Sequence, residues 1–513
     1  MRHAKILIFL TLAAVVFIAY GNVLKGPFLY DDNMLIVENP LIKNLSNALT
    51  YFRTDLFSYG PGERMSNSFR PMHTFLNAVD YFLWGDNSAG FHFTNVFLHL
   101  INVLLIFILL RNISKSALIA YLTAILYALH PINTQSVSYI AGRGDVLMSL
   151  FAALSLICYI AWYGKKTGGF LALSVFFYAL SVLSREASLI VLPLLIIGYI
   201  MYFGKPGSHS FKSIIPYFIV AIIYLFLRIL ILGVYIAPVG LEYVSFYRRL
   251  LTSIKGLFIS LGIILAPSGL HFDRFTAVER SILSPIALIS LIGLIAAVFA
   301  VVYLYKIGLK ESRKFAALVS FGFFWFLACM LPYFNIIPIQ VFVSENWLYQ
   351  PSVGIFFVAG TVVAFVFNRL KAKSMPVASY AVIAVFALTS LIYGFITHKR
   401  NADYLDPIRL FQANLRCEPN VKFYYMLGTE YGLKKEYNLA LEAFKKAIET
   451  DKTRPNLFVF NARFNLAVTY LRLKDRQRAL EEFKYLSDLK NVPDYVKIMW
   501  KERAAEVMKK LQY

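Results

Sequence analysis

Apolar runs of about 20 residues recur along the chain as far as residue 400, and they constrain the fold more than any other feature. A helix needs roughly 20 predominantly apolar residues to cross the hydrocarbon core of a bilayer. Of the 513 residues, 58% are hydrophobic and only 16% are charged, which is too apolar for an ordinary soluble protein. The sequence therefore predicts an all-α fold with a polytopic membrane domain.

Eleven of these runs are long enough for us to expect a spanning helix. A further apolar segment, 248–266, carries Arg248, Arg249 and Lys255 near one end, so we expect it to lie at the interface or to be re-entrant. The predicted spans lie near 5–24, 92–110, 116–133, 145–163, 170–184, 186–203, 214–235, 282–305, 315–334, 351–368 and 376–396.

The short connections expected on the N-terminal side are basic. Cytoplasmic loops carry an excess of Lys and Arg, so we expect a cytoplasmic N-terminus and, with an odd number of spans, a C-terminal region outside. A twelfth span at 248–266 would invert everything after it. The basic residues are Arg2, Lys5, Arg111, Lys115, Lys165, Lys166, Lys205, Lys212, Lys306, Lys310, Arg313, Lys314, Arg369, Lys371 and Lys373.

The net charge of +22 does not predict nucleic-acid binding, because the basic residues recur between apolar runs and do not form one face. The N-terminus has the layout of a signal peptide without a convincing cleavage site, so we expect an uncleaved signal anchor. Two of the three cysteines lie inside apolar runs and Cys417 stands alone, which indicates neither a disulfide framework nor a thiolate metal site.

Two adjacent carboxylates, Asp31 and Asp32, follow the first apolar run, near the start of a polar loop over residues 25–91. Like charge and partial desolvation raise a carboxyl pKa, which would tune one of the pair toward general-base catalysis. The segment is also good turn and helix-cap chemistry, and on its own residues that structural interpretation is the more frequent one. Between the two, we slightly favour Asp32 as the base.

Other ionisable residues lie at the ends of spans on the same predicted outer face. Each alone has an ordinary explanation, since a Pro after His ends a helix and a lone Arg often only snorkels. Together they predict the lining of a site, because ionisable groups at membrane depth are costly to keep. They are His130, Arg143, Asp145, Arg185, Glu186 and Glu345.

From about residue 400 the composition turns hydrophilic, which predicts a membrane domain over 1–398 and a soluble domain over 399–513. Two stretches, 39 residues apart from Leu427 to Leu466, match the tetratricopeptide (TPR) pattern, in which small residues let helices pack closely. Such arrays usually bind peptide or protein, although a role in packing against the membrane domain stays open. We expect a longer loop at Lys452–Leu457, capping helices at 405–417 and 494–511, and packing positions at Leu427, Gly428, Tyr431, Ala440, Phe444, Ala447, Leu466, Ala467, Tyr470, Ala479 and Phe483.

One series of short motifs runs through nearly the whole chain. It comprises the Asp31-Asp32 loop, Phe69-Arg70-Pro71, Gly90-Phe91-His92-Phe93-Thr94-Asn95, Leu129-His130-Pro131, Gly142-Arg143-Gly144-Asp145, Ser184-Arg185-Glu186 and Leu348-Tyr349-Gln350-Pro351-Ser352. As a series it resembles the transmembrane and TPR repeat-containing protein O-mannosyltransferases and their prokaryotic relatives. These are polytopic glycosyltransferases of the GT-C superfamily, which move a sugar from a polyprenyl-phosphate carrier to an acceptor at the non-cytoplasmic face.

The resemblance implies that Asp31 or Asp32 takes the proton of an acceptor hydroxyl as the anomeric carbon is attacked, with inversion. Arg143, Arg185 or His130 would neutralise the departing phosphate, the arginines first because their donor forks match phosphate oxygens. Asp145, Glu186 and Glu345 would complete the donor site. We expect a protein or peptide acceptor held by the repeats, in a bacterial inner (plasma) membrane with the site and repeats on the extracytoplasmic side. A divalent metal ion could bridge carboxylate and phosphate, but nothing in the sequence requires one.

Two departures from the family pattern stand out. Animal members carry many more repeats, so the acceptor could differ here. The late loop usually reads Glu-Arg-Tyr-Leu-Tyr but here is Glu345-Asn346-Trp347-Leu348-Tyr349, so no phosphate role passes to Asn346. Alternatives are transfer to a lipid or glycan, a non-enzymatic TPR scaffold, and a transporter, for which the sequence shows no matching halves.

Overall fold

The computed structural model describes residues 2–60, 66–204, 210–233, 244–274, 276–307, 313–339, 341–450, 457–488 and 502–511. The described chain is helical almost throughout, which confirms the all-α class, with one antiparallel pair of two-residue strands, β1 (Asp273–Arg274) and β2 (Val343–Ser344). It divides into two compact units, residues 1–268 with 272–402, and residues 269–271 with 403–513.

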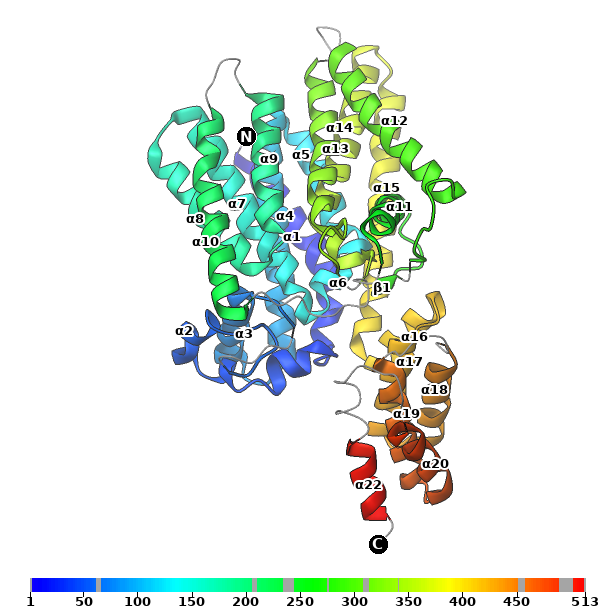
Figure 1. Ribbon diagram of the computed structural model, residues 1–513. Coiled ribbons are helices and arrows are strands. Elements are labelled where there is room, and N and C mark those ends of the chain that lie inside the picture. Colours follow the sequence, from blue (N-terminus) through cyan, green and yellow to red (C-terminus); the bar gives the residue numbers. More distant parts are fainter. Residues whose placement is uncertain are drawn as a thin grey trace. The chain divides into compact units, whose positions relative to one another are not determined.

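The first unit is a helical bundle, with the short helices α2 and α3 at one end of it (Figure 1). Its helices are α1 (Arg2–Tyr20), α2 (Ala48–Tyr51), α3 (Pro71–Trp84), α4 (Ser88–Ser114), α5 (Ala117–Leu129), α6 (Thr134–Val137), α7 (Arg143–Lys165), α8 (Gly168–Ser184), α9 (Ser188–Phe203), α10 (Ile215–Leu232), α11 (Phe246–Leu265), α12 (Pro285–Ile307), α13 (Arg313–Met330), α14 (Pro351–Ala372) and α15 (Pro376–Asn401).

Each of the eleven predicted spans contains a helix, but the helices differ in length. Among the described residues, seven are long and apolar enough to cross a membrane, or eight if the bent pair α5 and Pro131–Val137 counts as one span. The segments 168–184, 188–203 and 285–296 are shorter apolar helices. The polytopic class is thus confirmed, whereas the count of eleven stays a prediction. The segment 248–266 is a helix, α11, and is not among the candidate spans.

Helix α7 is central in the first unit, since it packs against α4, α8 and α9. The chain before it turns sharply, because α5 ends at His130-Pro131 and the next short helix is bent by 53°. The turn closes through a tight approach at Gly142, where a Cβ atom would lie 2.4 Å from the carbonyl oxygen of Gln135. Glycine is therefore required immediately before Arg143.

The second unit is built from helix pairs. They are α16 (Pro407–Cys417), α17 (Val421–Leu433), α18 (Tyr437–Thr450), α19 (Leu457–Arg472), α20 (Arg476–Ser487) and α22 (Arg503–Leu511). Ten of the expected packing positions are buried, and Tyr431 packs against the same core. A Cβ atom on Gly428 would lie 2.6 Å from Phe444, which shows why a small residue stands there. The longer loop expected at Lys452–Leu457 falls, apart from Leu457, outside the described residues, as does the first part of the predicted C-terminal cap.

Candidate functional site

The aspartate pair is held against the segment that leads into α7. The Asp32 carboxylate is buried and accepts hydrogen bonds from the backbone N–H groups of Leu29 (2.9 Å) and Ala141 (2.8 Å). The N–H of Asp31 donates to the Tyr139 hydroxyl oxygen at 3.0 Å, and the Asp31 residue is half-buried. Tyr30, just before the pair, has φ 47°, a left-handed conformation that is uncommon for a residue other than glycine. The two carboxylates therefore have different surroundings.

Burial is the main reason that the pKa of Asp32 rises to about 8, and the neighbouring charge of Asp31 adds to the rise. The two backbone hydrogen bonds and the Arg143 charge act in the opposite direction. Below pH 8 the Asp32 side chain is consequently mostly neutral.

Arg143, the first residue of α7, is buried inside the unit and held mainly through its two terminal nitrogens. Its guanidinium group forms an ion pair with Asp80 (2.8 Å) and donates hydrogen bonds to the Asn77 side chain (2.9 Å) and the Phe91 carbonyl (3.2 Å). The Phe91 ring also lies 5.4 Å from it. With 0% of its side chain exposed, Arg143 anchors the start of α7 and presents no free face.

Two further ion pairs lie nearer the surface. Arg185, in the short connection between α8 and α9, pairs with Asp145 in the first turn of α7. The Asn346 side chain also donates to Asp145, at 3.0 Å. The neighbouring pair, Arg70 with Glu186, is 2.9 Å long and about a quarter exposed on both sides. The pairs link α7, the connection after α8 and the turn before α3.

A histidine that the motif series did not single out lies at the same place. His73, in the first turns of α3, is 1% exposed. Its Nδ1 lies 3.4 Å from the position that a Cβ atom on Gly144 would occupy. Burial, and then the charges of Arg143, Arg70 and Arg185, lower its pKa well below the usual value. A sequence signal was present, because the polar residues His73, Asn77 and Asp80 recur at helical spacing and so share one face.

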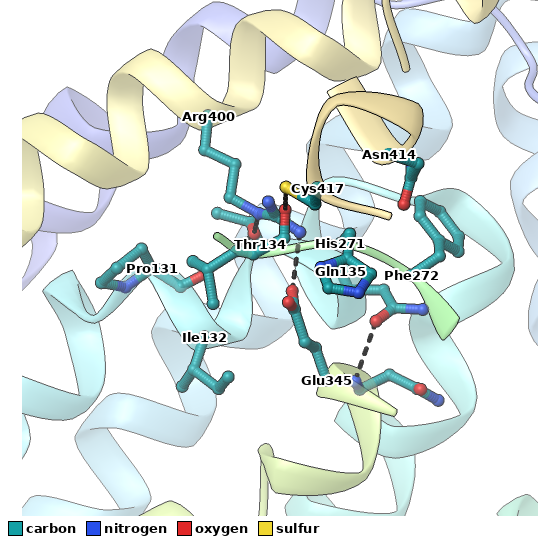
Figure 2. Close-up of polar contacts among 12 residues, drawn as sticks. Pro131, Ile132, Thr134, Gln135, His271, Phe272, Glu345, Arg400, Asn414 and Cys417 are labelled. Atoms are coloured by element: carbon teal, nitrogen blue, oxygen red, sulfur yellow. Dashed lines mark hydrogen bonds and ion pairs between the residues drawn. The ribbon is translucent and has the colours of Figure 1, made fainter. Parts of the chain in front are cut away.

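The structure places His130 and Glu345 differently from the other predicted residues. His130 accepts a hydrogen bond at Nδ1 from the Ile132 N–H (3.2 Å), and its Nε2 lies 2.9 Å from the Ile264 carbonyl, so both ring nitrogens are used by backbone. Glu345 is buried and pairs with Arg400 at 2.6 Å and with Arg274 at 3.6 Å. Figure 2 shows Arg400 reaching toward Glu345 and lying beside Thr134, to which it donates at 2.7 Å.

Asp31, Asp32, Arg143, Asp145, Arg185 and Glu186 are thus brought together around the start of α7. The sequence assigned no role to Arg70, His73, Asp80, Arg274 or Arg400. In the described part of the chain, no group of three or more His, Cys, Asp or Glu side chains could hold a metal ion. The half-buried Asp31 carboxylate can take a proton, and Arg70, Arg185 and the N-terminus of α7 carry positive charge that suits an anionic group.

Comparison with known families gives two matches. The family model described as dolichyl-phosphate-mannose-protein mannosyltransferase matches residues 68–232, and the one described as tetratricopeptide repeat matches residues 421–454. The first match contains Arg70, His73, Arg143 and Arg185 and begins after the aspartate pair.

Curated relatives extend over more of the chain. A Caenorhabditis elegans protein O-mannosyl-transferase, F38B6.6, is 26% identical over 82% of this chain and 60% of its own length. Human protein O-mannosyl-transferase TMTC3 is 23% identical over 93% of the chain and 54% of its own length, and human TMTC1 is 32% identical over 35% and 22%. The chain therefore spans at most about three-fifths of the length of these relatives. The resemblance drawn from the motif series is confirmed.

Among solved structures, an oligosaccharyltransferase from Archaeoglobus fulgidus aligns with 86% of this chain and 59% of its own. The TM-score is 0.43 and the sequence identity is 14%.

Proposed function

We propose that this chain, a relative of the transmembrane and TPR repeat-containing protein O-mannosyltransferases, is a membrane glycosyltransferase. It takes a hexose such as mannose from a polyprenyl-phosphate carrier and transfers it to an acceptor hydroxyl at the non-cytoplasmic face. The observation that carries the proposal is the 2.8 Å hydrogen bond from the Ala141 N–H to the Asp32 carboxylate. This bond holds the aspartate pair against the start of α7, where Arg143 is the first residue.

The geometry favours Asp31 as the general base and revises the slight preference for Asp32. Both Asp32 oxygens accept backbone hydrogen bonds and the side chain is enclosed, so it acts as a positioning residue. Asp31 is half-buried and thus the more exposed of the two residues, which favours it as the one that meets an acceptor hydroxyl. As the acceptor oxygen attacks the anomeric carbon, its proton passes to Asp31 and the bond to the phosphate oxygen breaks, with the electron pair leaving on that oxygen.

The departing phosphate needs positive charge that it can reach. Arg143 is enclosed with Asp80, so its part is to hold the start of α7. Arg185 and Arg70 are 10% and 23% exposed at the side chain, and they are the guanidinium groups that would meet the phosphate together with the first turn of α7. The repeat unit would hold a peptide acceptor, as helical-repeat arrays commonly do.

The test is transfer by purified protein from polyprenyl-phosphate mannose to Ser/Thr-containing peptides, followed by mass spectrometry. Asp31→Asn keeps the shape of the side chain but removes proton acceptance, and should slow transfer about 10²–10⁴-fold. Asp86→Asn, an exposed acid in the connection between α3 and α4, is the matched control and should transfer at the normal rate. Normal transfer by the correctly inserted Asp31→Asn, Asp32→Asn and double variants would exclude this mechanism and favour the scaffold alternative.

A further inference from the structure

His73 is a buried polar side chain whose hydrogen-bonding groups are not used. Across the described residues, neither its Nδ1 nor its Nε2 has a hydrogen-bond partner. A buried imidazole normally satisfies at least one nitrogen, because leaving a buried polar group without a partner costs about 1–3 kcal/mol. The ring lies against Gly144 in the first turn of α7, and the Ser184 carbonyl is 3.7 Å from the same Gly144 point.

The charges that face His73 come from three separate elements. Arg70 precedes α3 and is paired with Glu186, Arg143 begins α7 and is paired with Asp80, and Arg185 follows α8 and is paired with Asp145. After burial, the arginine charges are what hold the pKa of His73 low, so the ring is neutral in the protein without a bound anion. The first turn of α7 adds the partial positive charge of a helix N-terminus.

We propose that His73 takes up a proton when an anionic phosphate group binds at the first turn of α7, so that donor binding is coupled to protonation of this ring. This inference rests on the proposed function, because the phosphate is that of the polyprenyl-phosphate donor. His73 is a positioning residue in this scheme, since it acts on the charge of the site and the acceptor proton goes to Asp31.

The sign of the coupling follows from the charges. A bound anion offsets the arginines and gives the imidazolium a partner, so the pKa of His73 is higher in the complex than in the free protein. The complex then binds more protons than the free protein, and donor affinity increases as the pH falls through the interval between the two pKa values. One such group can change affinity by at most about tenfold per pH unit.

The coupling also has a use during transfer. The donor phosphodiester carries one negative charge, and the leaving phosphomonoester carries up to two once the bond to the sugar has broken. An imidazolium already formed on donor binding would balance the second charge, with its proton supplied by solvent before the reaction. No further reactant is needed.

The experiment measures proton uptake by calorimetry, with a short-chain polyprenyl-phosphate mannose as probe and no acceptor present. The phosphodiester of the probe does not titrate near neutral pH. Titrations at about pH 6 in two buffers of different ionisation enthalpy should give uptake of at least about half a proton per probe bound by the unmodified protein. His73→Asn should bind the probe with no uptake and with an affinity that no longer rises at lower pH.

Asp86→Asn, the exposed acid between α3 and α4 that also serves as the control for transfer, should keep the uptake. Probe binding by the unmodified protein without proton uptake would overturn the role of His73 and leave the proposed function standing. Proton uptake by His73→Asn equal to that of the unmodified protein would overturn the same role. No binding of any polyprenyl-phosphate sugar would overturn both. The measurement on the unmodified protein decides the question even if His73→Asn does not fold.

Discussion

The start of α7 and the core of the repeat unit are both buried, but they are held together in opposite ways. At the start of α7, oppositely charged side chains from α3, α7 and the connection after α8 form ion pairs. In the repeat unit, alanine, leucine and phenylalanine side chains from successive helices form an apolar core. Removing one partner of a buried ion pair leaves a charge without compensation, whereas a change in an apolar core costs only packing. The first region should therefore respond more strongly to a change of a few atoms.

The strongest test of this difference is Asp80→Asn. The substitution keeps the shape of the side chain but leaves the Arg143 charge buried without its partner, which should cost about 3–5 kcal/mol of stability. Thermal unfolding of the purified protein in detergent measures the loss. Asp80→Leu combined with Arg143→Met should recover most of it, because no buried charge remains. If Asp80→Asn unfolds at the normal temperature, the ion pair does not hold the start of α7.

In the repeat unit, Gly428→Val should cost about 1–3 kcal/mol through overpacking, because its Cβ atom would overlap the Phe444 ring. The loss should be confined to the second unit, so limited proteolysis should cut after residue 402 while the membrane unit stays intact. Gly432→Ala is the matched control, since no atom lies within 4 Å of the added methyl group. Equal proteolysis of the two variants would count against close packing at Gly428.

The pH dependence of stability separates Asp32 from ordinary surface carboxylates. Its pKa is raised to about 8 in the folded protein, so between about pH 4 and pH 8 the folded state binds a proton that the unfolded state has released. This group therefore makes the protein less stable as the pH rises through that interval, by at most about 1.4 kcal/mol per pH unit. In thermal unfolding at about pH 6 and pH 8, Asp32→Asn should lose less stability than the unmodified protein. A parallel fall in both proteins would contradict the burial of this carboxyl.

The same contrast explains what the sequence could predict. Repeat helices are neighbours in the chain, so spacing at Gly428, Ala440 and Phe444 predicts their pairing directly. Hydropathy predicts where the apolar helices lie. It does not distinguish a helix long enough to span the membrane from a shorter one such as α8 or α9.

The site depends on partners far apart in sequence, and local patterns do not reveal these. The motif series identifies Arg143 and Arg185. It does not reveal that Arg143 is enclosed by its pairing with Asp80, whereas Arg185 lies nearer the surface. The resemblance predicts a phosphate role for His130, which stays a prediction, but it does not reveal that the ring nitrogens lie against backbone groups of Ile132 and Ile264. His73 lies in a short amphipathic helix that carries no catalytic motif, so no local pattern singles it out.

The smallest effect on stability should come from the pair of Arg70 with Glu186, which has the same chemistry as Arg143 with Asp80 but is about a quarter exposed. Because water already screens it, Arg70→Gln should cost less than about 1 kcal/mol, well below the cost of Asp80→Asn. Its effect on function should be larger, since Arg70 faces both His73 and the proposed phosphate position. We expect weaker binding of the polyprenyl-phosphate sugar with little change in unfolding temperature, measured on the same preparation.

Arg228→Gln is a suitable control, since Arg228 donates only to Asn67 among the described residues and is not one of the charges that act on His73. If Arg70→Gln instead destabilises the protein as much as Asp80→Asn and leaves binding unchanged, exposure does not distinguish the two pairs. Arg70 would then be structural, and the phosphate would have to be met by Arg185 and the first turn of α7 alone.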